Sequence, residues 1–414
     1  MKKYEYLVLF LTIRNNKFFH QLLSNNFFTY SYLFKNFKKV YIIDLNNLAF
    51  LNKKNNINPN ILNNFFSNSN VKFVSLNKFI HLHEFLKSKK IIAIKGFKNG
   101  YKEIMINIFL KFYDVRLLQI YNVGNRNHSY NVSPSRTKLF KNFLIKKLAH
   151  KLTVFLSTVG LVGKIDIRFT ANPDYIRFNK TKIANKVANF FNFPYVKKFI
   201  PINSRAYDIS LNNKFRIKND YIAVLDEQLN APQWTKWRNK IKKQDVKLHY
   251  KKFNLYLKKL SKVLKKKVII CIHPDDNLNE KKKIFKDFIV KKYRTREYIY
   301  KSFLVVFFES SAIIDAILLN KNIITIKSKV MDGNQIATGL DWVKEINIAM
   351  CTIDHIETLN LTKDYLIKKK IIKKSKRIKL DYRNYTKNYI CTDVKNVMGV
   401  EKIQKTIKQI YRLD

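Results

Sequence analysis

Short apolar runs recur along the first half of the chain. Each is rich in Val, Ile, Leu, Phe or Tyr, as expected for strands buried on both faces of a parallel sheet. Lys- and Asn-rich stretches of helical length separate them. The runs are YLVLFLTI (6–13), KVYIIDL (39–45), VKFVSL (71–76), KIIAIKG (90–96) and RLLQIY (116–121). This alternation predicts βαβ units and a parallel sheet covered by helices on both faces.

The strongest helical pattern of the first half spans residues 137–160, where apolar residues recur three and four positions apart and a Gly follows. The second half repeats the same alternation. Its predicted strands are YIAVLD (221–226), KVIICIHP (267–274), FLVVFFE (303–309) and NIITIKS (322–328). Its predicted helices are LHYKKFNLYLKKLSKVL (248–264), TREYIYKS (295–302) and SAIIDAILLN (311–320).

A polar, Pro-containing stretch at residues 199–220 separates the two halves. We therefore predict an α/β fold with an N-terminal Rossmann-like domain at 1–212 and a C-terminal Rossmann-like domain at 213–395. Residues 396–414 are expected to form an amphipathic helix that packs back on the first domain. At 414 residues the chain is long enough for two such cores.

The charge is strongly positive, with 81 Lys and Arg against 29 Asp and Glu and a formal net charge of +52. Taken alone, this balance predicts nucleic acid or an anionic membrane as a partner. However, the Lys residues are spread over the whole chain and accompany many Asn, Ile, Phe and Tyr residues, all with A/T-rich codons. Genome composition is thus an alternative explanation, although phosphates and anionic membranes would still be attracted to such a surface.

The cysteines Cys271, Cys351 and Cys391 are too few and too scattered for a disulfide framework or a CxxC metal site. This usage fits a reducing compartment, so we expect a cytoplasmic protein, with peripheral contact at the inner membrane as an option. The apolar start is about half the length needed to span a bilayer and is interpreted as a strand.

Candidate chemistry lies at the carboxyl ends of the predicted strands, where open parallel sheets bind ligands. The strand KVIICI is followed by His273 and Pro274. An imidazole there can donate to a phosphate or act as a general acid or base, and the alternative is a surface histidine. The strand FLVVFF is followed by Glu309, Ser310 and Ser311. One serine can cap the next helix, whereas two hydroxyls at a helix N-terminus can hold an anion.

The segment Thr295-Arg296-Glu297 opens another predicted helix between these two strand ends. Thr295 is a suitable N-cap and Glu297 a suitable first-turn acid, so a structural role is sufficient. Arg296 could also reach a phosphate.

The order HPDD, TREYIYKS and VVFFESSAIIDAILLNKNIITI resembles the C-terminal half of GT-B glycosyltransferase-type proteins of bacterial surface-polysaccharide synthesis. In the sialyltransferase and polysialyltransferase group, an HP motif and a paired-hydroxyl motif hold a CMP-activated sugar. His273 and Pro274 match the first motif, and Ser310 and Ser311 match the second. The resemblance covers about residues 218–330. It implies two Rossmann-like domains with sheets facing a central cleft, the donor nucleotide being bound by the second domain.

The acidic catalytic motif of that family is not visible in the N-terminal half. Substitute candidates for acceptor binding or for the base are Arg14, His20, Asp226 and Glu227. Further polar residues at strand ends or loops are Asp44, Asn125, Arg126, His128 and Asp332. Each of these residues has a structural alternative as a turn, cap or surface residue. No DxD pair, Walker loop, HExxH or GxSxG motif occurs, so a metal-independent mechanism without a cofactor is expected.

These features together predict a glycosyltransferase that moves a sugar from a nucleotide-activated donor, with CMP-linked sugars as one option, to a cell-surface glycan or lipid-linked glycan. His273 is the expected catalytic residue, and the donor-binding residues are expected to be His273, Pro274, Thr295, Arg296, Glu309, Ser310 and Ser311. A nucleotide-sugar epimerase or polyol-phosphate transferase of the same fold is the nearest alternative. A basic nucleic-acid-binding protein and an inactive GT-B scaffold are alternatives of another class.

Overall fold

The structure is a computed structural model of the whole chain. It describes residues 6–11, 19, 23, 29–35, 37–45, 58–64, 70–76, 78–87, 91–96, 104–121, 156, 165–171, 196–212, 217–226, 229, 241–273, 276–308, 310–331, 333–393 and 396–411.

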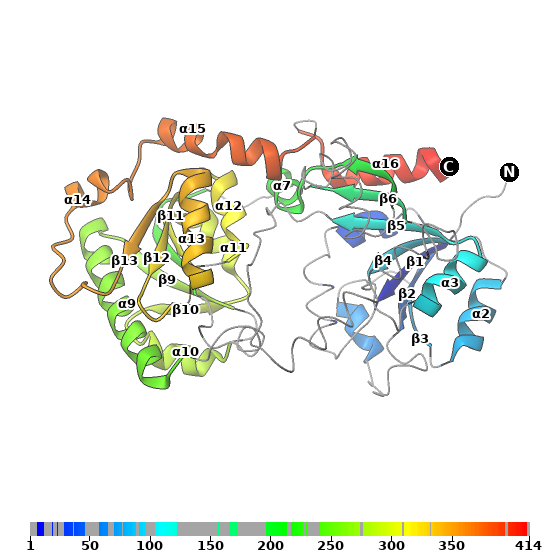
Figure 1. Cartoon of the computed structure of the whole chain (residues 1–414), viewed down its shortest axis with the longest axis horizontal. Helices are drawn as coiled ribbons and strands as arrows, with labels where there is room; N and C mark the ends of the chain where they lie inside the picture. The colour runs from blue at the N-terminus through cyan, green and yellow to red at the C-terminus, as the bar shows by residue number, and fades with distance from the viewer. Residues whose placement is uncertain are drawn as a thin grey trace. The chain divides into compact units, whose positions relative to one another are not determined.

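Two separate parallel sheets organise the chain (Figure 1). They belong to two compact units, of which unit 1 comprises residues 1–124, 136–209 and 391–414. Unit 2 comprises residues 125–135 and 210–390. The N-terminal unit is therefore completed by the last residues of the chain.

The sheet of unit 1 has the strand order β3-β2-β1-β4-β5-β6-β7. Its strands are β1 Tyr6–Leu11, β2 Lys39–Asp44, β3 Val71–Ser75, β4 Ile91–Gly96, β5 Arg116–Tyr121, β6 Ile165–Thr170 and β7 Val196–Pro201. Its helices with defined bounds are η1 Pro59–Asn64, α2 Phe79–Lys87, α3 Ile104–Phe112, α7 Arg205–Leu211 and α16 Gly399–Tyr411, and residues 29–34 are also helical. The five strands predicted for this half are all present.

The sheet of unit 2 has the strand order β10-β9-β8-β11-β12-β13, and every described pairing is parallel. Its strands are β8 Tyr221–Leu225, β9 Lys267–Ile272, β10 Ile289–Lys292, β11 Ser302–Phe307, β12 Asn322–Lys327 and β13 Ala349–Thr352. Its helices are α9 Lys243–Leu264, α10 Leu278–Ile284, α11 Thr295–Lys301, α12 Ile313–Leu318, α13 Gly333–Ile346, α14 Lys363–Lys368 and α15 Ser375–Tyr385, followed by the π-helical turn η3 Thr386–Ile390. The predicted α/β class with two Rossmann-like parallel sheets is confirmed.

Several elements were not anticipated from the sequence. The strands β6, β7, β10 and β13 were missed, and the stretch 199–220 that was interpreted as a polar boundary contains the end of β7 and the helix α7. The helix predicted at 137–160 lies outside the described residues apart from residue 156.

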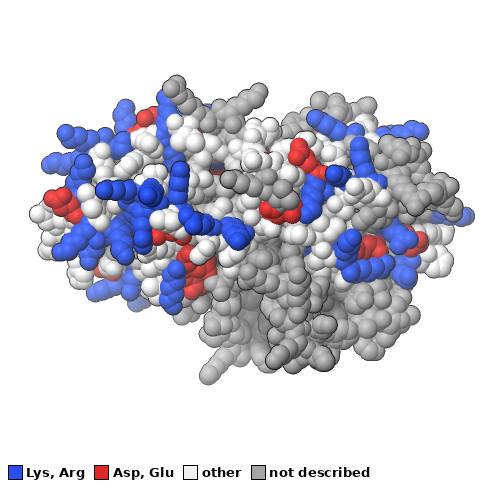
Figure 2. Space-filling view, turned by 90° about the horizontal axis from the view of Figure 1, so that it is seen from above, with Lys and Arg blue, Asp and Glu red and all other residues white. Residues whose placement is uncertain are grey.

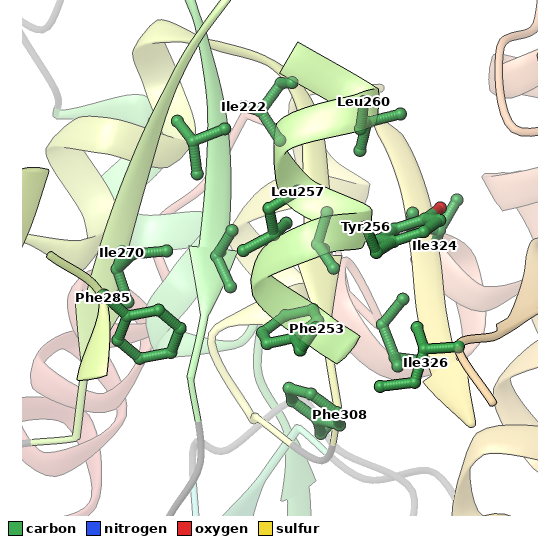
Figure 3. Packing of buried hydrophobic residues seen from close by; sticks show 14 of the residues in the cluster. Ile222, Phe253, Tyr256, Leu257, Leu260, Ile270, Phe285, Phe308, Ile324 and Ile326 are labelled. Carbon is green, nitrogen blue, oxygen red and sulfur yellow. The ribbon is translucent and has the colours of Figure 1, made fainter. Parts of the chain in front are cut away.

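Both faces of each sheet are covered by apolar side chains. In unit 2, alternate strand residues such as Ile222 and Ile270 pack under α9, which contributes Phe253, Leu257 and Leu260 (Figure 3). The opposite face carries α11, α12 and α13, and the ring of Phe307 on β11 lies 6.1 Å from that of Trp342 on α13. Burial of this many aliphatic and aromatic side chains is the main stabilising contribution in each unit.

The final helix α16 is part of the core of unit 1. Its apolar stripe, Val400, Ile403 and Ile407, is buried in the cluster that also holds Leu9 and Ile94. The apolar positions that recur at helical spacing in this segment are therefore the ones that are buried.

The start of α16 is held by a buried carboxylate. Asp208 in α7 accepts a hydrogen bond from the backbone N–H of Gly399 at 2.6 Å and one from Val400 at 3.0 Å. These bonds satisfy amides that have no partner within the helix. Burial raises the pKa of Asp208 to about 6, although both amides act to lower it.

The same junction requires a glycine at position 399. A Cβ atom there would lie 2.4 Å from the carbonyl oxygen of Asn203. Asn203 is itself fixed, because its side chain donates to the carbonyl of Val397 at 2.8 Å and accepts from Asp393 N–H at 2.9 Å. The backbone of the two segments could not separate without breaking these bonds.

We expect Gly399→Ala to lower the free energy of unfolding by about 2 kcal/mol, the usual cost of forcing atoms into a packed site. Urea unfolding followed by circular dichroism measures the change. The matched control is Gly339→Ala in α13, where the three nearest atoms to the new Cβ belong to side chains, the flexible end of Met350 at 2.7 Å and Thr325 at 3.3 and 3.7 Å, and the helix gains an alanine. Equal losses in the two variants would contradict the close-approach explanation.

Candidate functional site

The strand order of unit 2 reverses between β8 and β11, because the chain leaves β8 towards β9 and β10 and later returns to β11 on the other side. Ligands of open parallel sheets bind at the carboxyl ends of the strands at such a point. The strands β9 and β11 both pair with β8, so their ends are about 10 Å apart, two strand spacings. The predicted residues that follow β8, β9 and β11 therefore lie along one edge of one sheet.

A tight turn follows β9 and carries His273. The backbone N–H of His273 donates to Oδ2 of Asp276 at 3.1 Å, and the N–H of Asp276 donates back to the carbonyl of His273 at 2.9 Å. Lys292 in β10 donates to the carbonyl of Asp276 at 2.8 Å. Asp276 is buried while His273 is exposed, so the turn fixes the backbone of His273 and leaves its side chain near solvent.

A buried ammonium group lies next to this turn. Lys281 in α10 forms an ion pair with Asp226, the residue that follows β8, and donates to the hydroxyl of Tyr250 in α9 at 2.8 Å. Its Nζ atom also lies 3.9 Å from Oδ2 of Asp276. Lys281 and Asp226 are only 6% and 5% exposed. One side chain thus links the ends of β8 and β9 with α9 and α10.

The charges of this cluster depend on one another. Burial acts to lower the pKa of Lys281, but Asp226, Tyr250 and Asp276 together raise it, so the amine stays charged. Burial raises the pKa of Asp226 against the opposing pull of Lys281. The Oδ1 atom of Asp226 is buried without a hydrogen-bond partner. An ionised carboxylate with a spare oxygen at a strand end is chemically able to accept a proton.

The two serines after β11 are arranged differently from the prediction. The helix α12 begins at Ile313 with Ala312 as its N-cap, which makes no side-chain capping bond. The hydroxyl of Ser310 instead accepts from the N–H of Ala312 at 3.3 Å, a turn that competes with capping. The N-cap position, which one of the two serines was expected to be able to fill, is therefore occupied by Ala312; Ser310 is half-buried and Ser311 is exposed.

Arg296 is already engaged within unit 2. Its Nε atom lies 3.1 Å from Oδ2 of Asp315 in α12, so the guanidinium ties α11 to α12. Thr295 is the first residue of α11 and Arg294 occupies the N-cap position without a side-chain bond, which corrects the predicted N-cap. Glu297 pairs with Arg294 at 2.7 Å and with Lys301 at 2.6 Å.

Several predicted site residues lie outside the described part of the chain. They are Arg14, His20, Asn125, Arg126, His128, Glu227, Pro274, Glu309 and Asp332. Asp44 is described and is buried at the end of β2 in unit 1. The roles predicted for these residues stay predictions.

Sequence reasoning missed Tyr250 and Lys281. Lys281 begins the run KKK at 281–283, in which its neighbours Lys282 and Lys283 are exposed, so composition alone could not distinguish it. The acid at 276, two residues after the HP pair, was a usable signal, because a short acidic side chain after a strand often bonds to the backbone of its own turn.

Within the described ranges, no group of three or more His, Cys, Asp or Glu residues is placed to hold a metal ion. In the same part of the chain, no helix combines the length and the apolar character needed to span a bilayer.

Comparison with known proteins identifies the fold of this chain but not its family. No family model matches the chain, and no curated protein matches it by sequence. Among solved structures, a protein from Listeria monocytogenes assigned as a UDP-N-acetylglucosamine 2-epimerase is similar, with 10% identity, a TM-score of 0.51, and coverage of 99% of this chain and 97% of that one. The wall teichoic acid polymerase TagF is similar with 10% identity, a TM-score of 0.50, and coverage of 99% and 89%. The chain therefore has the two-domain GT-B fold.

We expect Lys281→Met to lower the free energy of unfolding by about 3–5 kcal/mol, because it leaves Asp226 buried without its cation. The double variant Lys281→Met with Asp226→Leu replaces the pair by apolar groups and should recover most of this loss. Urea unfolding of both variants is the measurement. A single variant as stable as the parent would show that the cluster contributes nothing.

A buried histidine lies beneath the end of β11. The ring of His249 in α9 packs against Tyr250, Phe253 and Phe308, and neither ring nitrogen has a hydrogen-bond partner. Burial lowers its pKa to about 4, with Lys281 acting in the same direction and Asp354 against it. Protonation therefore favours the unfolded chain, and the stability that the neutral ring provides above its ordinary pKa of about 6.5 is lost as the pH falls towards 4.

We expect His249→Phe to remove part of this acid sensitivity. Between about pH 7 and about pH 4.5, the parent should lose about 2.5 kcal/mol more unfolding free energy than the variant. Urea titrations at the two pH values give the difference, in which the contributions of all other groups cancel. The variant His81→Phe, at an exposed position of α2, is the control and should match the parent.

Proposed function

We propose that the protein is a glycosyltransferase that uses a nucleotide-activated sugar, with CMP-linked sugars among the candidate donors, and a cell-surface glycan as acceptor. In this proposal unit 2 binds the donor and unit 1 binds the acceptor. The observation that carries it is that His273 follows β9 and that Ser310 and Ser311 follow β11. These two strands lie on either side of β8, where the strand order reverses.

The proposed chemistry is displacement at the anomeric carbon. The acceptor hydroxyl attacks this carbon, the bond between carbon and phosphate oxygen breaks, and the nucleotide phosphate leaves with the electron pair. His273 would protonate or hydrogen-bond that phosphate, since its side chain is exposed at the strand end. The hydroxyls of Ser310 and Ser311 would donate to phosphate oxygens, with Pro274, Thr295, Arg296 and Glu309 around the same nucleotide.

Asp226 is our candidate for the base that takes the proton of the acceptor, and Glu227 is the alternative beside it. Burial raises the pKa of Asp226 and so brings it closer to neutral pH. A general base works best when its pKa is near the pH of the reaction. Lys281 would act as a positioning residue that holds this carboxylate. Arg14 and His20 remain candidates for contacts with the acceptor.

We expect purified protein, incubated with a panel of CMP-, UDP- and CDP-linked donors and a glycan acceptor, to release one free nucleotide together with an extended glycan. An isomerised sugar without free nucleotide would identify an epimerase instead. Transfer of a polyol phosphate with release of CMP would identify a polyol-phosphate transferase. Turnover of none of the donors, with a bound nucleotide detected by calorimetry, would identify an inactive scaffold.

With the active donor, His273→Ala should lower kcat by about 10²- to 10⁴-fold, because a proton donor to the leaving group is lost. The matched control is His355→Ala, an exposed histidine after β13, which lies four strands away from β9. This control should keep the parent rate. Unchanged kcat in His273→Ala would exclude the assigned role of this residue.

A further inference from the structure

The most concentrated run of positive charge outside the site lies at the end of unit 2. Ten of the twenty residues from 368 to 387 are Lys or Arg, and Asp381 is the one acid among them. All but Lys373 of these cations are exposed; we call the exposed ones the α14–α15 basic surface: Lys368, Lys369, Lys370, Lys374, Lys376, Arg377, Lys379, Arg383 and Lys387. Figure 2, seen from the side of α15, shows Lys and Arg side chains gathered over this part of the molecule.

The single acid offsets at most one of the nine exposed cations of this surface, Arg377. Asp381 accepts from Asn347 at 3.1 Å and pairs with Lys373 at 2.7 Å and Arg377 at 3.2 Å, with a side chain that is 6% exposed. Its charge is shared between Lys373, whose side chain is buried, and Arg377, so the other eight exposed cations are not paired with it. Asp364, in the first turn of α14, is the nearest exposed acid before the run.

The helix α15, which carries several of these cations, is held in place by a buried apolar stripe. Ile378, Tyr382 and Tyr385 form its buried stripe; the ring of Tyr385 lies 5.1 Å from that of Trp342, and Tyr382 donates to the carbonyl of Lys321 at 3.0 Å. At 3.6 residues per turn, Lys376, Lys379 and Arg383 fall together on the opposite stripe. Their positions are therefore set by the packing of the helix.

Exposed aliphatic side chains accompany the cations. Leu380 lies on the same outward stripe and is 46% exposed, and Ile367 at the end of α14 is 52% exposed. Cations with aliphatic side chains between them suit an anionic bilayer, where ammonium groups meet lipid phosphates and short apolar groups enter the headgroup region. Nucleic-acid binding by stacking needs exposed aromatic rings, whereas Tyr382 and Tyr385 are buried.

We propose that the α14–α15 basic surface docks this protein on an anionic phospholipid bilayer. Each Lys or Arg near such a surface strengthens binding about fivefold, and the contribution is screened within a Debye length by salt. This proposal does not rest on the transferase assignment, since vesicle binding is measured without donor or acceptor.

The test is flotation of the full-length protein with phosphatidylcholine vesicles that either contain or lack phosphatidylglycerol. We expect partition onto the anionic vesicles only, and release when the salt concentration is raised. The variant Lys376→Glu, Lys379→Glu, Arg383→Glu should weaken partition at least about tenfold. Leu380→Asp should weaken it further without changing the count of cations.

The matched control is Lys282→Glu, Lys283→Glu, Lys286→Glu, exposed cations in and just after α10 that change the net charge by the same amount. We expect this variant to partition like the parent. Equal weakening in both triple variants would show that total charge, and not this surface, determines binding, and would overturn the proposal.

Two further results would also overturn it. One is equal partition onto vesicles with and without phosphatidylglycerol. The other is that duplex DNA or single-stranded RNA, added at the same charge concentration, removes the protein from vesicles and binds it more tightly, with the α15 variant losing that binding. Circular dichroism melts of both triple variants establish that each is folded, which the exposed positions lead us to expect.

Discussion

The ammonium group of Lys281 is the interaction on which the carboxyl edge of unit 2 depends. It joins Asp226 after β8 with Tyr250 on α9, and it lies near the acid that closes the turn after β9. A buried carboxylate and a buried amine each carry a large desolvation cost alone, and their mutual attraction offsets part of it. Because three elements meet at this one cation, the backbone that carries His273 is fixed by a polar cluster as well as by the apolar core.

The fold class was predictable because the central strands can be recognised from their apolar sequences. β1 and β8 are apolar throughout, and β9 and β11 are apolar after their first residues, Lys267 and Ser302, since both faces of a parallel sheet are covered. Three of the four missed strands, β6, β7 and β10, carry charges that interrupt this signal, and the fourth, β13, is only 4 residues long. In β6, Arg168 is buried but bonds to Gln119 at 2.8 Å, and in β10, Lys291 and Lys292 occupy half of an edge strand. A pairing that satisfies a charge inside a sheet depends on a residue far away in sequence.

The candidate site was predictable only in part, and for a related reason. Strand ends in a parallel sheet meet at one edge, so the positions of His273 and Ser310 follow from the strand pattern alone. The partners of these residues do not. That Ser310 bonds to Ala312 and that Arg296 bonds to Asp315 depends on local turn geometry and on the packing of two helices. Lys281 could be recognised only once burial was known, because 81 basic residues in the chain obscure any single one.

The completion of unit 1 by α16 has a consequence for the order of biosynthesis. The ribosome makes the strands of unit 1 first, but Val400, Ile403 and Ile407, which close their apolar face, are made much later. The whole of residues 210–390 is synthesised in between. Nascent unit 1 must therefore wait with an open hydrophobic surface while its neighbour leaves the exit tunnel, so premature termination just before residue 399 would yield a finished second unit attached to an unfinished first one.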